Sequence, residues 1–125
     1  PAQLEEINRG RQRPELSLTR EEFGDHVVLR VGGEVDFHTA PTLYAYLVEQ
    51  MGRRVVVDMA GVSFCDSSGL GALVTAHKDY RTKQADMVLA APRPNVARLL
   101  RLTQLDSVIG VFDTAQEALA RGPVR

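Results

Sequence analysis

The chain has 125 residues, of which 44% are hydrophobic and 25% are charged, the length and composition of one ordinary globular domain. Fifteen Lys and Arg face sixteen Asp and Glu, so the formal net charge of -1 gives no support to a nucleic-acid-binding protein. The one cysteine, Cys65, excludes an internal disulfide and a thiolate-rich metal site, and no apolar run reaches the roughly 18 residues of a membrane span. We therefore expect a soluble, cytoplasmic domain that contacts neither nucleic acid nor membrane, and no residue pattern indicates a metal or a cofactor.

Residues 1–14 mix charge, Gln, Gly and Pro with few large apolar side chains, which predicts a flexible or partly helical arm. We expect the domain itself over residues 15–121 and a short tail over 122–125. From Leu16 apolar and polar residues alternate, as they do again over 27–31, which predicts two strands. Gly24 and Asp25 lie between the two runs and favour a tight hairpin turn.

A helix is expected next, with Thr39 as its N-cap, Pro41 in its first turn and Gly52 closing it. Beyond it, strand and helix patterns alternate. The strands are expected at 55–59, 87–91 and 108–112, and the helices from Ser67 or Ser68 to about 80, at 96–103 and at 114–119. Thr114 followed by Glu117 is a capping box that opens the last helix. These elements predict an α/β domain with a mixed sheet of four to five strands and about four packed helices. The patterns leave open whether the helices cover one face of the sheet or both.

The segment from Val62 to Gly71 follows the strongest predicted strand and opens an amphipathic helix. In open α/β sheets, ligands and modifications lie beyond the carboxyl ends of strands, so this segment is the candidate for function. Asp66 and Ser67 both suit a helix N-cap. Gly69 and Gly71 each cost a helix about 1 kcal/mol relative to Ala, so they predict that something approaches the backbone closely.

Ser68 falls in the first turn of this predicted helix, beside unpaired N–H groups and the positive end of the helix dipole. A phosphate is favourable there by roughly 0.3–1 kcal/mol at an exposed site. The pattern alone therefore leaves two interpretations of these serines open, namely helix capping and a modified or ligand-binding hydroxyl.

The six residues 66–71, Asp-Ser-Ser-Gly-Leu-Gly, resemble the signature of bacterial anti-sigma factor antagonists. These share the STAS domain, named for sulphate transporters and anti-sigma factor antagonists. Residues 33–36, with Thr39 and Ala40, resemble the second motif of that family, and residues 105–119 resemble its usual ending. The resemblance covers about residues 15–121 and implies a single STAS-like α/β domain.

In that family, the serine directly before the first glycine is phosphorylated by an anti-sigma factor that is also a serine kinase. By position that residue is Ser68 here, with Ser67 as the second choice. The resemblance implies that the unphosphorylated chain binds the anti-sigma factor and releases the sigma factor, and that a serine phosphatase restores it. The implied partner surface consists of Asp36, Asp66, Ser67, Ser68, Gly69 and Leu70. The alternative is a scaffold or ligand-sensing STAS domain without a direct role in sigma release.

No pattern supports an enzyme. Neither serine has the glycine two positions earlier that a serine-hydrolase elbow needs. Asp58 ends a valine-rich strand as in a two-component receiver, but the acid pair and the lysine of a receiver are lacking, so we interpret it as capping the turn through Gly61 or as part of the same negative surface. We interpret Phe37 as core-facing rather than as a partner contact, Cys65 as a small buried residue and His77 as a packed helix histidine.

Overall fold

The computed structural model describes residues 16–121, so the predicted arm over 1–14 and the predicted tail over 122–125 lie outside the described residues. Five strands form one sheet in the order β1-β2-β3-β4-β5. β1 is antiparallel to β2, and the other neighbouring strands are parallel. The mixed α/β sheet predicted from the sequence is confirmed.

The first two strands form the predicted hairpin. β1 spans Ser17–Phe23 and β2 spans His26–Val35. Gly24 has a φ of +63°, a conformation that favours glycine and allows the tight turn. β1 is mostly exposed at the edge of the sheet, whereas Val27, Val28 and Leu29 of β2 are fully buried because helices cover both faces of the sheet there.

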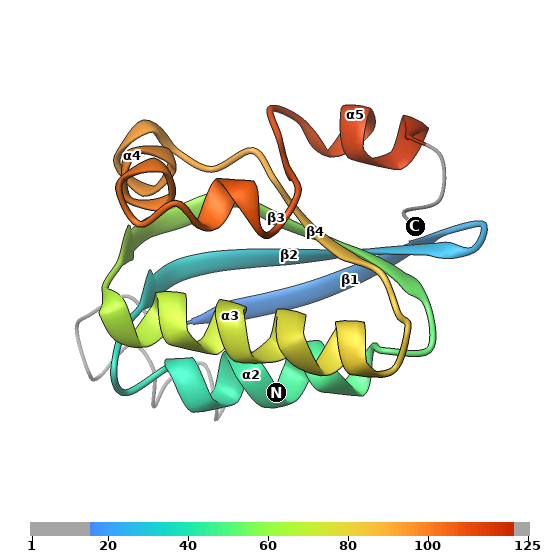
Figure 1. Cartoon of the computed structure of the whole chain (residues 1–125), viewed down its shortest axis with the longest axis horizontal. Coiled ribbons are helices and arrows are strands. Elements are labelled where there is room, and N and C mark those ends of the chain that lie inside the picture. Colours follow the sequence, from blue (N-terminus) through green and yellow to red (C-terminus); the bar gives the residue numbers. More distant parts are fainter. Residues whose placement is uncertain (1–15, 122–125) are drawn as a thin grey trace, which may run out of the picture.

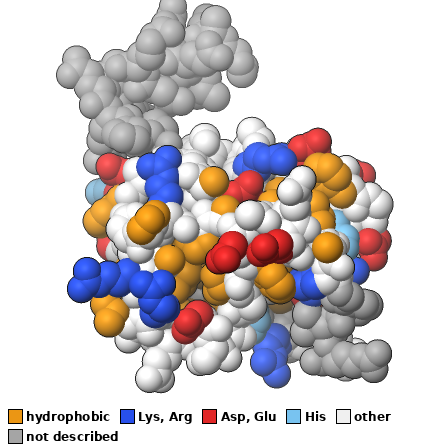
Figure 2. All heavy atoms as spheres, turned by 90° about the horizontal axis from the view of Figure 1, so that it is seen from above, with side chains coloured by type: hydrophobic (Ala, Val, Ile, Leu, Met, Phe, Trp, Pro, Cys, Tyr) orange, Lys and Arg blue, Asp and Glu red, His pale blue; other side chains and the backbone are white. Residues whose placement is uncertain are grey.

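The helices cover both faces of the sheet, which answers the question that the patterns left open (Figure 1). α2, Ala40–Glu49, and α3, Ser67–Thr82, lie side by side on one face. α4, Pro94–Leu102, and α5, Ala115–Ala120, lie on the other side. On this second side, Lys and Arg side chains are separated by acidic and hydrophobic ones rather than gathered into one patch (Figure 2).

The hydrophobic core lies mainly between the sheet and the helices α2 and α3. It contains the fully buried Tyr80, whose hydroxyl donates a hydrogen bond of 2.5 Å to the carbonyl of Leu47 and so joins the two helices. A smaller cluster on the opposite face packs Ala118 of α5 against Val28, Val56 and Val88. None of the helices within residues 16–121 combines the length and the apolar composition that a membrane span requires.

The central strand is longer than predicted. β3 spans Arg54–Cys65, where the sequence predicts a strand over 55–59 only. Its second half pairs with β2 across two register shifts, and these irregularities interrupt the alternation that would have marked it as strand. Asp58 accepts a hydrogen bond of 3.0 Å from the N–H of Ala60, but both residues lie within β3, where the register with β2 shifts, so its interpretation as a turn cap is wrong.

Two expectations about the bounds of elements are wrong, one for the start of β5 and one for the end of α2. β4 spans Met87–Ala90, and its last two residues pair with Val111–Phe112. β5 therefore has two residues and not the five expected over 108–112. Before it, Leu105–Ser107 forms a 3₁₀ turn. α2 ends at Glu49 with Gln50 as its C-cap, so Gly52 does not close that helix.

Candidate functional site

The carboxyl ends of β2 and β3 meet at one edge of the sheet. Val35 pairs with Cys65 in the parallel register, and the N–H of Asp66 donates a 3.1 Å hydrogen bond to the carbonyl of Val35. This pairing places the turn after β2, which contains Asp36, beside the start of α3. The sequence-predicted site residues are therefore brought to one end of the molecule. They are Asp36, Asp66, Ser67, Ser68, Gly69 and Leu70.

Asp66 is the N-cap of α3. Its backbone is extended, and its Oδ1 accepts a 3.0 Å hydrogen bond from the N–H of Gly69, one of the donors that a helix start leaves without a partner. The carbonyl of Asp66 accepts the first helical bond, from Leu70 at 3.0 Å. Of the two candidate caps, Asp66 does the capping, and the hydroxyls of Ser67 and Ser68 are not used for it.

Replacing Asp66 with Ala is expected to lower the free energy of unfolding by about 1 kcal/mol, because the N–H of Gly69 loses its acceptor. Asp66→Asn keeps an acceptor oxygen and is expected to stay within about 0.5 kcal/mol of the parent. Urea denaturation followed by circular dichroism measures both changes. Equal losses in the two variants would contradict a capping role and would show that the carboxylate charge itself stabilises the fold.

The turn after β2 is held by Asp36 and Thr39. Asp36 Oδ1 accepts hydrogen bonds from the N–H groups of His38 at 2.9 Å and Thr39 at 3.1 Å. These bonds, led by that of Thr39, hold the pKa of Asp36 below its usual value. Thr39 stands at the N-cap position of α2 as predicted, but its hydroxyl does not cap that helix. It donates to the carbonyl of Glu34 at 2.8 Å and accepts from the N–H of Asp36 at 2.9 Å.

The two glycines of the motif lie in opposite surroundings. A Cβ on Gly69 would come within 2.7 Å of Cys65 Sγ and 2.8 Å of the carbonyl oxygen of Val35, so the predicted close approach is confirmed there. A Cβ on Gly71 would meet nothing within 4 Å, so no described part of this chain approaches Gly71, and an approach by a partner stays a prediction. Cys65 is buried as expected, and its burial raises the pKa of the thiol to about 11, which keeps it protonated and unreactive.

Ser68 lies at the rim of an open apolar groove between α2 and α3. The groove has a volume of about 310 Å³ and is lined mainly by small and aromatic side chains. Its other lining residues are Phe37, Ala40, Pro41, Tyr44, Gly71, Ala72 and Thr75. Ser67 is exposed and Ser68 is half-buried, and within residues 16–121 neither hydroxyl has a hydrogen-bonding partner. The Ser68 hydroxyl is therefore available beside the positive end of α3.

Phe37 is the residue that the sequence interpretation misplaced. It is 74% exposed and lines the groove beside Ser68, so the expectation that it faces the core is wrong. The reason is the turn held by Asp36, which lifts the next residues away from the sheet. A phenylalanine between Asp36 and His38, outside both the strand and the helix periodicity, was the signal that could have indicated exposure. Tyr44, also on the groove, is fixed by a hydrogen bond from its hydroxyl to Asp79.

Comparisons with known proteins agree on this architecture. The sequence pattern of the STAS domain matches residues 17–118. An anti-sigma-B factor antagonist of Listeria monocytogenes is 36% identical over 101 residues, which cover 78% of this chain and 89% of that protein. The crystal structure of an anti-sigma factor antagonist from Mycobacterium paratuberculosis is 28% identical, with a TM-score of 0.76 over 84% of this chain and 92% of that one. The phosphorylated form of the Bacillus cell fate determinant SpoIIAA shares the fold at 22% identity, with a TM-score of 0.63 over 82% of this chain and 96% of that one.

Proposed function

This chain belongs to the STAS domain family, and we propose from its relatives and its site that it is an anti-sigma factor antagonist. Proteins of that class are regulatory binding proteins rather than enzymes. The proposed partner is an anti-sigma factor, which releases its sigma factor when this chain binds. Residues 15–121 form the proposed binding domain, and the proposed place of action is the cytoplasm.

The observation that carries this proposal is the position of Ser68 on the rim of the apolar groove, beside the exposed Phe37. Aromatic side chains that lie exposed next to a small apolar pocket are typical anchors of protein interfaces. We propose that the anti-sigma factor covers the groove, the turn at Asp36 and the start of α3. Asp36 and Asp66 are held by backbone N–H groups, so this surface is rigid before the partner arrives.

A phosphate on Ser68 would reverse this binding through charge. It adds about -1.5 to -2 charge at neutral pH and three strong acceptor oxygens. The N–H groups at the start of α3 stabilise such a group in the free chain, so the domain stays folded. In the complex, the same charge lies at a contact with the partner, and desolvating it opposes association. We propose that the anti-sigma factor is itself the serine kinase and that a serine phosphatase restores binding.

Phosphate transfer to a single serine tests this mechanism. The purified chain, incubated with ATP and a kinase-type anti-sigma factor, is expected to gain one phosphate, located on Ser68 by peptide mass spectrometry. Ser68→Ala should accept none, whereas Ser67→Ala should be modified at a rate close to that of the parent. Transfer that survives in Ser68→Ala and is lost in Ser67→Ala would overturn the assignment. Binding without any phosphate transfer would favour the scaffold or ligand-sensing alternative.

A further inference from the structure

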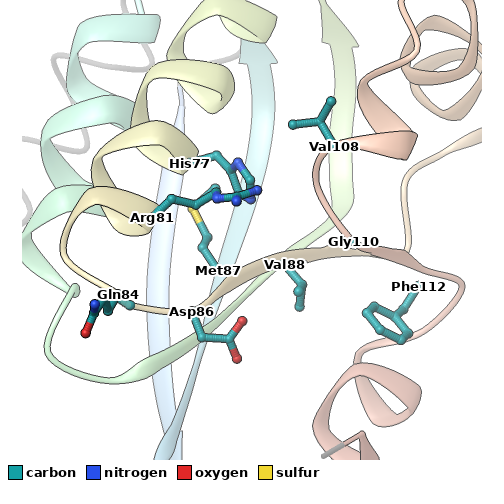
Figure 3. Close-up of a pocket in the computed structure, with 10 residues that line it drawn as sticks. His77, Arg81, Gln84, Asp86, Met87, Val88, Val108, Gly110 and Phe112 are labelled. Carbon is teal, nitrogen blue, oxygen red and sulfur yellow. The ribbon is translucent and has the colours of Figure 1, made fainter. Parts of the chain in front are cut away.

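A second cavity lies away from Ser68, between the C-terminal half of α3 and the strands β4 and β5 (Figure 3). Its volume is about 570 Å³, within the roughly 300–1,000 Å³ that small-molecule sites occupy. It shares no lining residue with the groove at Ser68, and the proposed function makes no use of it.

Two side chains of α3, one helical turn apart, face this cavity (Figure 3). His77 is only 8% exposed, and within residues 16–121 its ring nitrogens have no hydrogen-bonding partner. The ring nitrogens of His77 still have solvent-accessible surface, so a ligand in the cavity can bond to them in place of water. Arg81 is exposed at the cavity wall and makes no ion pair with any described residue.

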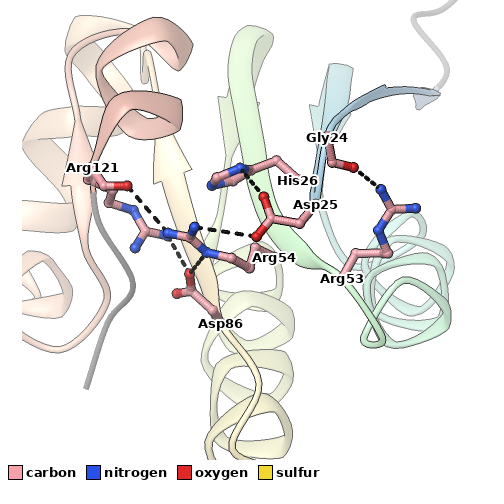
Figure 4. Close-up of polar contacts among 7 residues, drawn as sticks. All are labelled: Gly24, Asp25, His26, Arg53, Arg54, Asp86 and Arg121. Atoms are coloured by element: carbon pink, nitrogen blue, oxygen red, sulfur yellow. Dashed lines mark hydrogen bonds and ion pairs between the residues drawn. The ribbon is translucent and has the colours of Figure 1, made fainter.

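The charge around the cavity favours an anion. Asp86 is the acidic residue of the lining, but its carboxylate already forms ion pairs with Arg121 at 2.7 Å and with Arg54 at 3.3 Å (Figure 4). Its carboxylate therefore does not neutralise Arg81. Burial and the charge of Arg81 lower the pKa of His77, against a smaller opposing effect of Asp86, which favours the neutral ring.

Apart from the polar Gln84, the rest of the wall is apolar. Met87 and Val88 of β4 line the cavity, together with Phe112 of β5. Val108, which is 55% exposed because it lies outside the short β5, adds an apolar side chain at the cavity. A ligand that fits this wall carries a flat, apolar body next to its charged group.

We propose that this cavity binds a small organic anion, whose acidic group is held by Arg81 and His77 and whose flat apolar body packs against β4 and β5. The proposal is independent of the proposed function, because the two sites share no residue.

The fluorescent aromatic sulfonate anilinonaphthalene sulfonate has this chemistry and serves as the probe. Its titration into the purified chain is expected to give a saturable signal. The backbone amide NMR shifts should change at residues 77–88 and 108–112 and stay unchanged around Phe37. Arg81→Gln is expected to weaken binding by about tenfold, because a charged hydrogen bond is lost.

Lys78→Gln is the matched control, because it removes the same charge from an exposed position of α3 that does not line the cavity. It should bind the probe as the parent does. Phenylnaphthylamine, the uncharged counterpart of the probe, should bind more weakly to the parent and be insensitive to Arg81→Gln. Equal affinity of Arg81→Gln and Lys78→Gln, or NMR changes confined to the groove at Phe37, would overturn the proposal.

Discussion

Phosphorylation of Ser68 is expected to lower the affinity of this chain for its anti-sigma factor by about a hundredfold or more. The expectation follows from the groove, because a phosphate on its rim must be desolvated when the partner binds. Isothermal titration calorimetry of the phosphorylated and unphosphorylated chain measures the change. Ser68→Glu should show a smaller loss, since it carries about half the charge.

The control is Ser67→Glu, which adds the same charge one residue earlier at an exposed position that does not line the groove. It is expected to weaken binding much less than Ser68→Glu. Both variants should melt at or above the temperature of the parent, because an acidic residue in the first turn of a helix stabilises it. Equal losses of affinity in the two variants would contradict a local effect of Ser68 and would indicate a general repulsion by charge.

Gly69→Ala is expected to lower the free energy of unfolding by about 3 kcal/mol, the upper end of the usual cost of overpacking. Its Cβ would lie 2.7 Å from both Cys65 Sγ and Val35 Cγ1, and 2.8 Å from the carbonyl oxygen of Val35. That carbonyl accepts the bond from the N–H of Asp66, so it cannot move away without breaking the contact that joins β2 to the start of α3. The midpoint of urea denaturation should fall at an unchanged slope.

Gly71→Ala is the matched control, because it makes the same substitution in the same turn of the helix, where the Cβ meets nothing within 4 Å. It is expected to raise the free energy of unfolding by about 0.5–1 kcal/mol, the usual gain of Ala over Gly inside a helix. Opposite signs in the two variants would support the packing argument. A stabilised Gly69→Ala would show that α3 is not seated against β2 as described.

Local patterns were enough to predict most elements of this fold. Alternation of apolar residues predicts β1 and β2, and the turn at Gly24 follows from the glycine itself. The cap residues Asp66 and Thr114 mark the starts of α3 and α5, where each side chain accepts a backbone N–H. These features depend on interactions within a few residues of the chain, so the sequence carries them in full. The motif over 66–71 is equally local, which is why it indicated the family.

The tertiary structure decided what depends on the alignment of distant segments. Gly69 and Gly71 are indistinguishable in the sequence. The packing of α3 against Val35 leaves no room for a Cβ at Gly69, whereas a Cβ at Gly71 meets nothing within 4 Å. The exposure of Phe37 follows from the turn between β2 and α2, and the cavity at His77 from the shortness of β5. None of these has a periodic signal, because each depends on a turn or on the packing of elements and not on the spacing of apolar residues. The sequence therefore determined the elements and the family, and the packing of those elements determined which residues are free to meet a partner or a ligand.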